Sequence, residues 1–196
     1  MENTKPLRIK VIAGSTRAGR FSDQAAVWIA EEIKKQDGVV VEVLDLLDYP
    51  MPFFNEPVSP SYKQEPYKNE AVARFTLKIQ EGDAFVLVTP EYNHGTSGVL
   101  KNALDWVYPE WNNKAVAFVS YGSVGGARAV EQLRLNAIEL QMAPIRTSVH
   151  IPGEQYFPVI MGGANAQELF ASLAQKAEAM ITQLLWWAGA LKNARS

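Results

Sequence analysis

The sequence predicts an α/β fold in which five parallel strands form one sheet that is covered by helices on both faces. Short apolar runs alternate along the chain with segments whose apolar residues recur every three or four positions. This alternation of strands and helices is typical of a parallel sheet buried on both sides. The composition, with 47% hydrophobic and 20% charged residues, is that of an ordinary globular protein.

The first element is a strand over residues 7–13, where alternation gives way to a continuous apolar run. A helix follows, and a second strand is predicted over residues 39–44, directly after the turn signal Asp37-Gly38. A proline-rich connection then occupies residues 48–66. The helix between the two strands has one apolar face, formed by Ala26, Ile29, Ala30 and Ile33.

The middle of the chain repeats this order of elements. A helix over residues 69–81 leads to a fully apolar strand over residues 84–89. A further helix is predicted over residues 98–108, and the fourth strand over residues 115–120. Each strand is followed by a turn rich in glycine or proline, which marks where it ends.

The last part of the chain supplies a helix over residues 127–141, a fifth strand over residues 145–151 and a long helix over residues 166–192. We see no internal repeat or linker, so residues 1–196 are predicted to form one domain. Five strands of this kind fit the flavodoxin-like order 2-1-3-4-5 of a three-layer sandwich. The last helix is amphipathic through Leu169, Leu173, Ala177, Met180, Leu184, Trp187 and Leu191.

Charge and hydropathy exclude two classes of partner. The net charge is −2, whereas a nucleic-acid-binding protein usually carries a basic face. No apolar run approaches the ~20 residues that span a bilayer. The polar start at residues 1–6 does not resemble a signal peptide, so we expect a cytoplasmic protein without a membrane or nucleic-acid partner.

The absence of cysteine restricts the chemistry further. It excludes disulfides, thiolate catalysis and cysteine-ligated zinc or iron–sulfur clusters. The two histidines, His94 and His150, lie far apart in the sequence, so we expect no metal site. Any redox chemistry must therefore come from a bound organic cofactor.

The loop after the first strand, residues 14–22, has the composition of a phosphate-binding site. Its turn directs backbone N–H groups and the positive end of a helix dipole toward one spot. Ser15 and Ser22 add neutral donors, and Arg17 and Arg20 add planar cations that suit phosphate oxygens. A nucleotide or nucleotide-like cofactor is the predicted ligand. The alternative is a surface turn in which Ser22 is a helix N-cap and the arginines are solvated.

The same loop lacks the signatures of two common nucleotide sites. Gly14 and Gly19 have the spacing of a P-loop, but Arg20 and Phe21 stand where that motif needs Lys and Ser/Thr. The Gly-x-Gly-x-x-Gly motif of dinucleotide sites is also absent. The remaining fit is a terminal monophosphate, bound by amides, hydroxyls and arginine without a metal ion.

In a sheet of order 2-1-3-4-5, ligands bind beyond the carboxyl ends of the first, third and fourth strands. The loop after the third strand, residues 89–98, begins at Pro90, which cannot extend the strand ladder. Its backbone can bind the polar edge of a planar ring, with Tyr92 against the ring face and Asn93 offering an amide. Alternatively, Tyr92 is a core residue and His94 a plain loop residue, the interpretation we favour for His94 taken alone.

The loop after the fourth strand, residues 120–128, contains three glycines in five positions. Such a loop suits close approach of the backbone to a flat ligand. The alternative is a flexible turn with a helix N-cap, the interpretation we favour for this loop taken alone. Arg128 lies in the first turn of the following helix, which is unfavourable for the helix dipole. Its position therefore hints at an anionic or carboxylate partner.

Together, the three loops resemble the NADPH-dependent FMN reductase family, flavodoxin-like flavoproteins that include quinone, azo-dye and chromate reductases. The resemblance runs from about Arg8 to Ile151. Many relatives carry proline at the position of Ser97, so this chain departs from them in that loop. The motifs are Gly14-Ser-Thr-Arg17 with Ser22, Pro90-Glu-Tyr-Asn93 with Gly98-Val-Leu-Lys-Asn-Ala103, and Gly122-Ser-Val-Gly-Gly126.

The resemblance implies a set of cofactor-binding residues from all three loops. In the first loop, Ser15, Arg17 and Ser22 would hold the FMN phosphate, with Arg20 as a fourth contact. In the second loop, the residues lining the isoalloxazine would be Pro90, Glu91, Tyr92, Asn93 and His94. In the third loop, the residues closing its other side would be Ser120, Tyr121, Gly122, Gly125 and Gly126.

The implied function is that of an FMN-dependent NAD(P)H oxidoreductase. Hydride would pass from NADPH or NADH to bound flavin, and then to a quinone, flavin, azo compound or metal oxyanion, in a ping-pong sequence. No catalytic side chain is required because the chemistry is centred on the flavin. The alternative is an FMN electron carrier that serves protein partners, for which a charge of −2 gives little support. A weaker third reading is a nucleotide-binding module without redox activity.

The regions outside the three loops are expected to govern acceptor choice and assembly. Residues 48–66 form too long a segment for a simple connection, so they either line the site or pack on another subunit. The family commonly forms homodimers or homotetramers, so a homo-oligomer is expected. Aromatic residues that fit an interface or the core equally well are Trp106, Tyr108, Trp111, Trp186 and Trp187.

Overall fold

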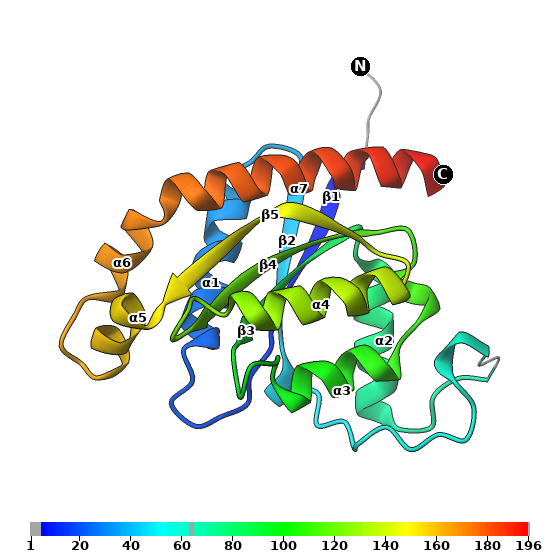
Figure 1. The fold of residues 1–196 in the computed structure, drawn as a ribbon. Coiled ribbons are helices and arrows are strands. Elements are labelled where there is room, and N and C mark those ends of the chain that lie inside the picture. The colour runs from blue at the N-terminus through cyan, green and yellow to red at the C-terminus, as the bar shows by residue number, and fades with distance from the viewer. Residues whose placement is uncertain (1–4, 63–64, 196) are drawn as a thin grey trace.

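The computed structural model describes residues 5–62 and 65–195, and it contains the predicted five-stranded parallel sheet (Figure 1). The strand order β2-β1-β3-β4-β5 confirms the predicted order 2-1-3-4-5. Because β1 pairs with both β2 and β3, the strand order switches direction beside β1. The strands are β1 (Leu7–Ala13), β2 (Val39–Asp45), β3 (Ala84–Pro90), β4 (Ala115–Gly122) and β5 (Ala143–Pro152).

Two helical layers cover the sheet and confirm the predicted three-layer arrangement. One face packs against α1 (Ser22–Lys34) and α7 (Ala174–Arg195), and the other against α2 (Glu70–Glu81), α3 (Gly98–Trp106) and α4 (Ala127–Glu139). Successive residues of a strand enter opposite cores, as Val86 and Leu87 of β3 do. The strands lie between the two cores, and β3 and β4 are buried along their whole length.

The predicted domain over residues 1–196 includes positions outside the described ranges. Residues 1–4, 63–64 and 196 lie outside them, as does most of the predicted polar start at residues 1–6. In the part of the chain that the structure describes, no helix combines the length and apolar character needed to cross a membrane.

The C-terminal third differs most from the prediction. The helix expected over residues 166–192 is two helices, α6 (Ala166–Ser172) and α7, separated at Leu173. Leu173 is 1% exposed, and the turn there buries its side chain in the same core as Leu169 and Ala177. No glycine or proline marks this break in the sequence. The three- and four-residue spacing of the apolar residues therefore continues across it and predicts a single helix.

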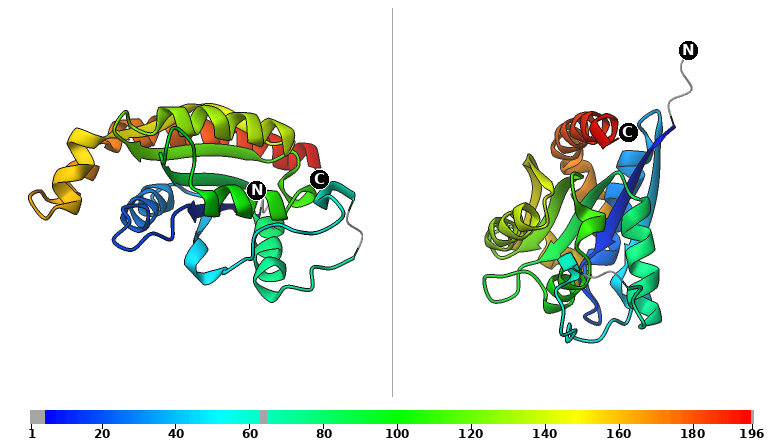
Figure 2. Two further views of the ribbon diagram at one scale, coloured as in Figure 1. Left: turned by 60° about the horizontal axis from the view of Figure 1, so that its bottom comes forward. Right: turned by 90° about the vertical axis from the view of Figure 1, so that its right-hand side faces the viewer.

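A short helix between β5 and α6 was not predicted. Helix α5 (Gly153–Ile160) carries Pro158 in its interior, which disfavours a helix, and it begins at the turn signal Pro152-Gly153. It lies beside α6 at one end of the molecule (Figures 1 and 2).

The predicted helix over residues 98–108 ends earlier than expected, at Trp106. Tyr108 precedes Pro109 and leaves the helical conformation.

The long connection between β2 and α2 is tied to α3 by side-chain hydrogen bonds. The Asn102 side chain accepts from the Phe54 N–H (2.9 Å) and donates to the Pro52 carbonyl (2.8 Å). The Trp106 indole N–H donates to the same carbonyl (2.7 Å). Trp106 and Trp111 are thus core residues, which decides between the two predicted roles for these aromatics in favour of packing.

Lys114 is a buried cation at the opposite end of the sheet from the carboxyl edge. It is 7% exposed, and its Nζ donates to the carbonyl oxygens of Ile79 (2.8 Å) and Gln80 (3.0 Å) in the last turn of α2. The Ile79 carbonyl also accepts from the N–H of the C-cap residue Gly82 (3.2 Å), so Lys114 adds a second donor to the carbonyl end of the helix. Burial, and next the charge of Arg195, lower the pKa of Lys114 to about 8.

Lys114→Met is therefore expected to change how stability depends on pH. Between the folded pKa of about 8 and the ordinary lysine pKa of 10.5, the unfolded chain holds a proton that the folded chain has lost. Stability contributed by this group thus rises with pH across that window, by up to about 3 kcal/mol at ~1.4 kcal/mol per pKa unit. Chemical denaturation at pH 7.5 and pH 10 measures the difference between wild type and variant. A difference that stays constant with pH would contradict the shifted pKa.

Candidate functional site

The loops that follow β1, β3 and β4 are joined to one another at the carboxyl edge of the sheet. The hydroxyls of Ser15 and Tyr92 lie 3.0 Å apart and connect the first two loops. The Ser97 hydroxyl donates to the Gly14 carbonyl, and the Glu91 N–H donates to the Tyr121 carbonyl (2.9 Å). The three loops singled out in the sequence therefore form one connected surface.

The first loop leaves the sheet at a position that only glycine can occupy. A Cβ on Gly14 would lie 2.6 Å from the Val88 carbonyl oxygen and 2.8 Å from Leu100 Cδ2. The Gly14 N–H donates to the same Val88 carbonyl (2.8 Å), so β1 and β3 stay in contact up to the start of the loop. This close contact sets the position from which the loop turns toward α1.

Beyond Gly14, the loop divides into a buried base and an exposed tip. Ser15 and Ser22 are fully buried, and the Ser22 hydroxyl donates to the Ser15 carbonyl (3.4 Å). Arg17 is exposed and forms no ion pair within the described part of the chain. The backbone N–H groups of the tip residues Thr16, Ala18 and Gly19 have no acceptor among the described residues.

Two expectations about this loop need revision. Ser22 is the first residue of α1 rather than its N-cap, which is Phe21 and makes no side-chain cap bond, so the reading of Ser22 as a cap is wrong. Arg20 is not a free cation, because its guanidinium forms a salt bridge with Asp45 at the end of β2. The Arg20 side chain is 10% exposed, and its Nε has no partner among the described atoms.

The second loop contains a tight turn over residues 92–95. The N–H groups of Tyr92 and Gly95 each donate to the other's carbonyl, at 2.9 and 3.0 Å. Asn93 (φ +50°) and His94 (φ +68°) are both left-handed, as the central residues of a type I′ turn are. Pro90 belongs to β3 as its last residue, one position further than predicted. The turn leaves Asn93 and His94 exposed.

Glu91 connects the second loop to the first turn of α4. Its side chain is 4% exposed and accepts from Arg128 Nε (2.6 Å) and from the Arg128 N–H (3.2 Å). The carboxylate partner that the position of Arg128 suggested is thus present. Arg128 Nη1 also lies 2.8 Å from His94 Nε2. Because a guanidinium only donates, Nε2 accepts in this contact, which leaves Nδ1 as the nitrogen of His94 that carries a proton.

The third loop owes its glycines to contacts within the protein. A Cβ on Gly122 would lie 2.9 Å from Glu91 Cβ, and one on Gly126 would lie 2.7 Å from Ser120 Cβ. Gly125 and Gly126 both have φ +76°, which favours glycine in any case. The exposed tip of the loop is formed by Ser123 and Val124, which sequence reasoning did not select.

Ser120 and Tyr121 face the interior from the end of β4. Ser120 is fully buried, and its hydroxyl donates to the Gly125 carbonyl (2.7 Å). The Tyr121 ring packs edge-on against Phe21 and Tyr156, with ring centroids 5.3 Å away in each case. Burial raises the pKa of the Tyr121 hydroxyl well above its ordinary value. Its carbonyl oxygen accepts from the Glu91 N–H of the second loop.

The residues present fit a phosphate-bearing planar ligand at this edge. The first loop offers unengaged N–H groups, the exposed cation Arg17 and the N-terminal end of α1, a combination that suits an anion. The second and third loops offer exposed backbone turns beside it. No group of three or more His, Asp or Glu residues that could hold a metal ion occurs in the described ranges.

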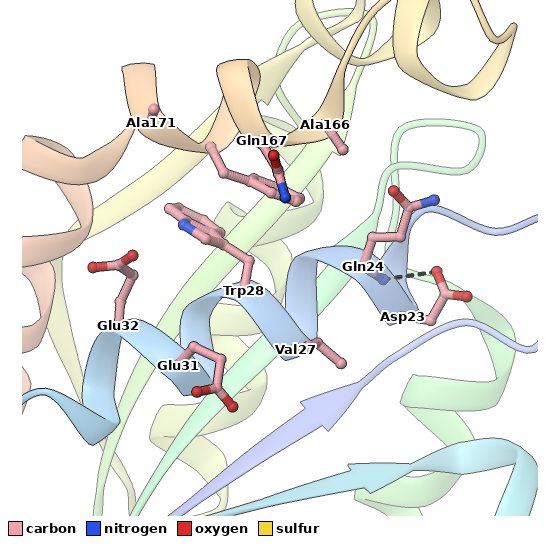
Figure 3. Close-up of a pocket in the computed structure, with 10 residues that line it drawn as sticks. Asp23, Gln24, Val27, Trp28, Glu31, Glu32, Ala166, Gln167 and Ala171 are labelled. Carbon is pink, nitrogen blue, oxygen red and sulfur yellow. Dashed lines mark hydrogen bonds between the residues drawn. The ribbon is translucent and has the colours of Figure 1, made fainter.

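One surface cavity lies away from these loops. It has a volume of about 770 Å³ and lies between α1 and α6, where Trp28 and Phe170 stack with centroids 4.8 Å apart (Figure 3). A smaller cavity of about 240 Å³ borders the first loop at Thr16 and is lined by the segment after β2 and by α3. Its apolar lining comes from Leu46, Leu47, Tyr49, Pro50, Met51 and Val99.

Comparison with known proteins agrees with this geometry. Residues 7–155 match the family described as NADPH-dependent FMN reductase. The chain is 37% identical over 150 residues to an NAD(P)H-dependent FMN reductase of Schizosaccharomyces pombe, covering 76% of this chain and 75% of the relative. It is 33% identical over 142 residues to an NAD(P)H:quinone oxidoreductase of Solanum tuberosum, covering 69% and 70%.

A solved structure supports the fold. The flavoenzyme FerB of Paracoccus denitrificans, an NAD(P)H:(acceptor) oxidoreductase, superposes with a TM-score of 0.67 at 21% identity, covering 91% of this chain and 97% of FerB. The family match covers every strand and all three loops. This chain belongs to the NADPH-dependent FMN reductase family, and is an oxidoreductase with FMN and a nicotinamide as its cofactors.

Proposed function

We propose that this protein passes reducing equivalents from NAD(P)H to a small acceptor, with FMN held at the carboxyl edge of the sheet. The observation that carries the proposal is that the three loops are hydrogen-bonded to one another, and that the first of them has an exposed arginine and N–H groups without an acceptor among the described residues. When bound, FMN supplies the redox chemistry. The protein supplies binding and orientation, so no side chain is assigned a catalytic role.

The proposed phosphate site combines charge with backbone donors. Arg17 reaches solvent and would donate to phosphate oxygens. The N–H groups of Thr16, Ala18 and Gly19, which have no acceptor among the described residues, would donate to the same group. Ser15 and Ser22 form the base of the site. Arg20 contributes at longer range, because Asp45 already binds its guanidinium.

The proposed isoalloxazine site uses the second and third loops. Residues 90–94 would offer backbone groups to the ring, while the Glu91 side chain is already ion-paired with Arg128. Tyr92 forms the junction with Ser15. On the other side stand Ser120, Tyr121, Gly122, Gly125 and Gly126, of which Gly122, Gly125 and Gly126 give the loop its shape.

We further propose that nicotinamide and acceptor occupy the same place in turn, which gives ping-pong kinetics. Quinones are the acceptor class we favour, since a relative at 33% identity is named a quinone oxidoreductase. The apolar cavity beside Thr16, walled by residues 46–51, is a suitable location for the acceptor's substituents. Free flavin, azo compounds and metal oxyanions are the other acceptors to be compared.

Steady-state kinetics test this proposal against the electron-carrier alternative. Initial rates measured over a grid of NADPH and menadione concentrations are expected to give parallel double-reciprocal lines. Intersecting lines would contradict alternation at one place. A protein that binds FMN but turns over only when a protein donor is added would be a carrier instead.

We propose that the chain acts as a single-domain cytoplasmic protein that assembles as a homodimer or homotetramer. Exposed apolar side chains support assembly: Trp186 is 67% exposed, Leu135 68% and Ile138 61%. Sedimentation at micromolar concentration measures the state. A monomer at every concentration would contradict the proposed assembly.

A further inference from the structure

A short hydrogen-bonded chain links the edge strand β5 to the third loop. His150 Nδ1 lies 2.8 Å from the Ser120 hydroxyl oxygen, and that hydroxyl lies 2.7 Å from the Gly125 carbonyl oxygen. Ser120 is fully buried and His150 is partly buried. The contact crosses from β5 through β4 to the loop that carries the exposed tip residues Ser123 and Val124.

Counting protons fixes the direction of this chain. A serine hydroxyl has one hydrogen, and a carbonyl oxygen can only accept, so the Ser120 hydrogen is directed to Gly125. The Ser120 oxygen must then accept from His150, which requires a proton on Nδ1. The chain therefore runs from His150 to Ser120 to Gly125, and its first donor is the imidazole.

Packing makes the loop depend on this pair of side chains. A Cβ on Gly125 would lie 3.0 Å from His150 Cβ, and a Cβ on Gly126 would lie 3.0 Å from the Ser120 hydroxyl oxygen. Both glycines have φ +76°, and the Gly125 N–H closes the turn on the Gly122 carbonyl (2.9 Å). The loop thus packs directly against the side chains of His150 and Ser120.

We infer that His150 is a positioning residue that sets the shape of the third loop through Ser120, and thereby the affinity of the protein for FMN. This inference rests on the proposed function, in which that loop closes one side of the isoalloxazine site. His150 itself lies on a strand outside the three loops and is assigned no contact with the cofactor.

The tautomer of His150 tests the geometry without any cofactor. Long-range ¹H–¹⁵N correlation spectra of the apo protein near neutral pH are expected to show a proton on Nδ1 of His150. His94 is expected to have the same tautomer, so His94→Ala is used to assign the two signals. A proton on Nε2 alone at His150 would overturn the inference.

FMN affinity, measured by quenching of flavin fluorescence, tests the consequence. His150→Ala removes the donor and is expected to weaken FMN binding about tenfold, the effect of losing roughly 1.4 kcal/mol. His150→Asn places an amide nitrogen where Nδ1 stood and is expected to restore most of the affinity. Equal losses in both variants would overturn the inference, because the donor would then not be what matters.

A double-mutant cycle separates action through Ser120 from a general packing effect. In a Ser120→Ala background, His150→Ala is expected to cause little further loss of FMN affinity. Additive losses would overturn the inference, and so would wild-type affinity in His150→Ala. A wild-type protein that fails to bind FMN would instead overturn the proposed function, together with its consequence here, whatever tautomer the apo protein shows.

Discussion

Gly126→Ala is expected to destabilise the protein by roughly 2–5 kcal/mol. The φ of +76° costs an alanine roughly 1–2 kcal/mol. The added Cβ would also lie 2.7 Å from Ser120 Cβ and 2.9 Å from the Tyr121 nitrogen, and such overpacking costs about 1–3 kcal/mol. Thermal unfolding should show a melting temperature lower by about 5–15 °C for a chain of this size.

Gly162 provides a matched control for this substitution. It has the same φ of +76°, but a Cβ there would meet nothing within 4 Å. Gly162→Ala is therefore expected to cost only the backbone term, about 1–2 kcal/mol. Equal shifts in the two variants would show that the contact with Ser120 and Tyr121 contributes nothing, and would remove our explanation of the third loop.

Arg17→Ala is expected to lower FMN affinity about 10- to 100-fold. A hydrogen bond to a charged group contributes about 1.5–3 kcal/mol, and Arg17 is the exposed cation of the phosphate site. Because Arg17 is solvent-exposed, the loss should shrink as salt is added. Titration of FMN into apo protein at two ionic strengths measures both effects.

The exposed Arg146 on β5 serves as the control, since it lies outside the three loops. Arg146→Ala changes the net charge by the same amount as Arg17→Ala. We expect it to leave FMN affinity within about twofold of wild type, well under the ~1.4 kcal/mol of a tenfold change. Unchanged affinity in Arg17→Ala would contradict the assignment of the phosphate site.

The sheet could be predicted in full because its strands are defined by local sequence. β3 and β4 are continuous apolar runs, and their neighbours follow from the alternation with amphipathic helices. The break at Leu173 could not be predicted, since Leu173 continues the apolar stripe of both helices. Helix α5 could not be predicted because Pro152 and Pro158 are typical of turns and loops. Its contact with the rest of the protein is made by Tyr156, which packs on Phe21 and Tyr121.

The site was predictable as a set of loops but not as a set of contacts. Glycines, hydroxyls and arginines identified the loops, and the position of Arg128 indicated a carboxylate. The partners of Arg20 and Ser15 lie 25 and 77 positions away, so no local pattern reveals Asp45 or Tyr92. The sequence suggested that the third-loop glycines approach a ligand, which stays a prediction. No local pattern reveals the close contacts that the structure gives them with Ser120, His150 and Glu91.

The central claim is that this chain binds FMN and reduces it with a nicotinamide. The most direct test is the visible absorbance spectrum of the purified protein after incubation with FMN and removal of free flavin. NADPH and then menadione are added to this sample under anaerobic conditions. We expect a bound oxidised flavin that bleaches with NADPH and recovers with the quinone. A protein that retains no flavin, or whose flavin NADPH leaves oxidised, would contradict the account.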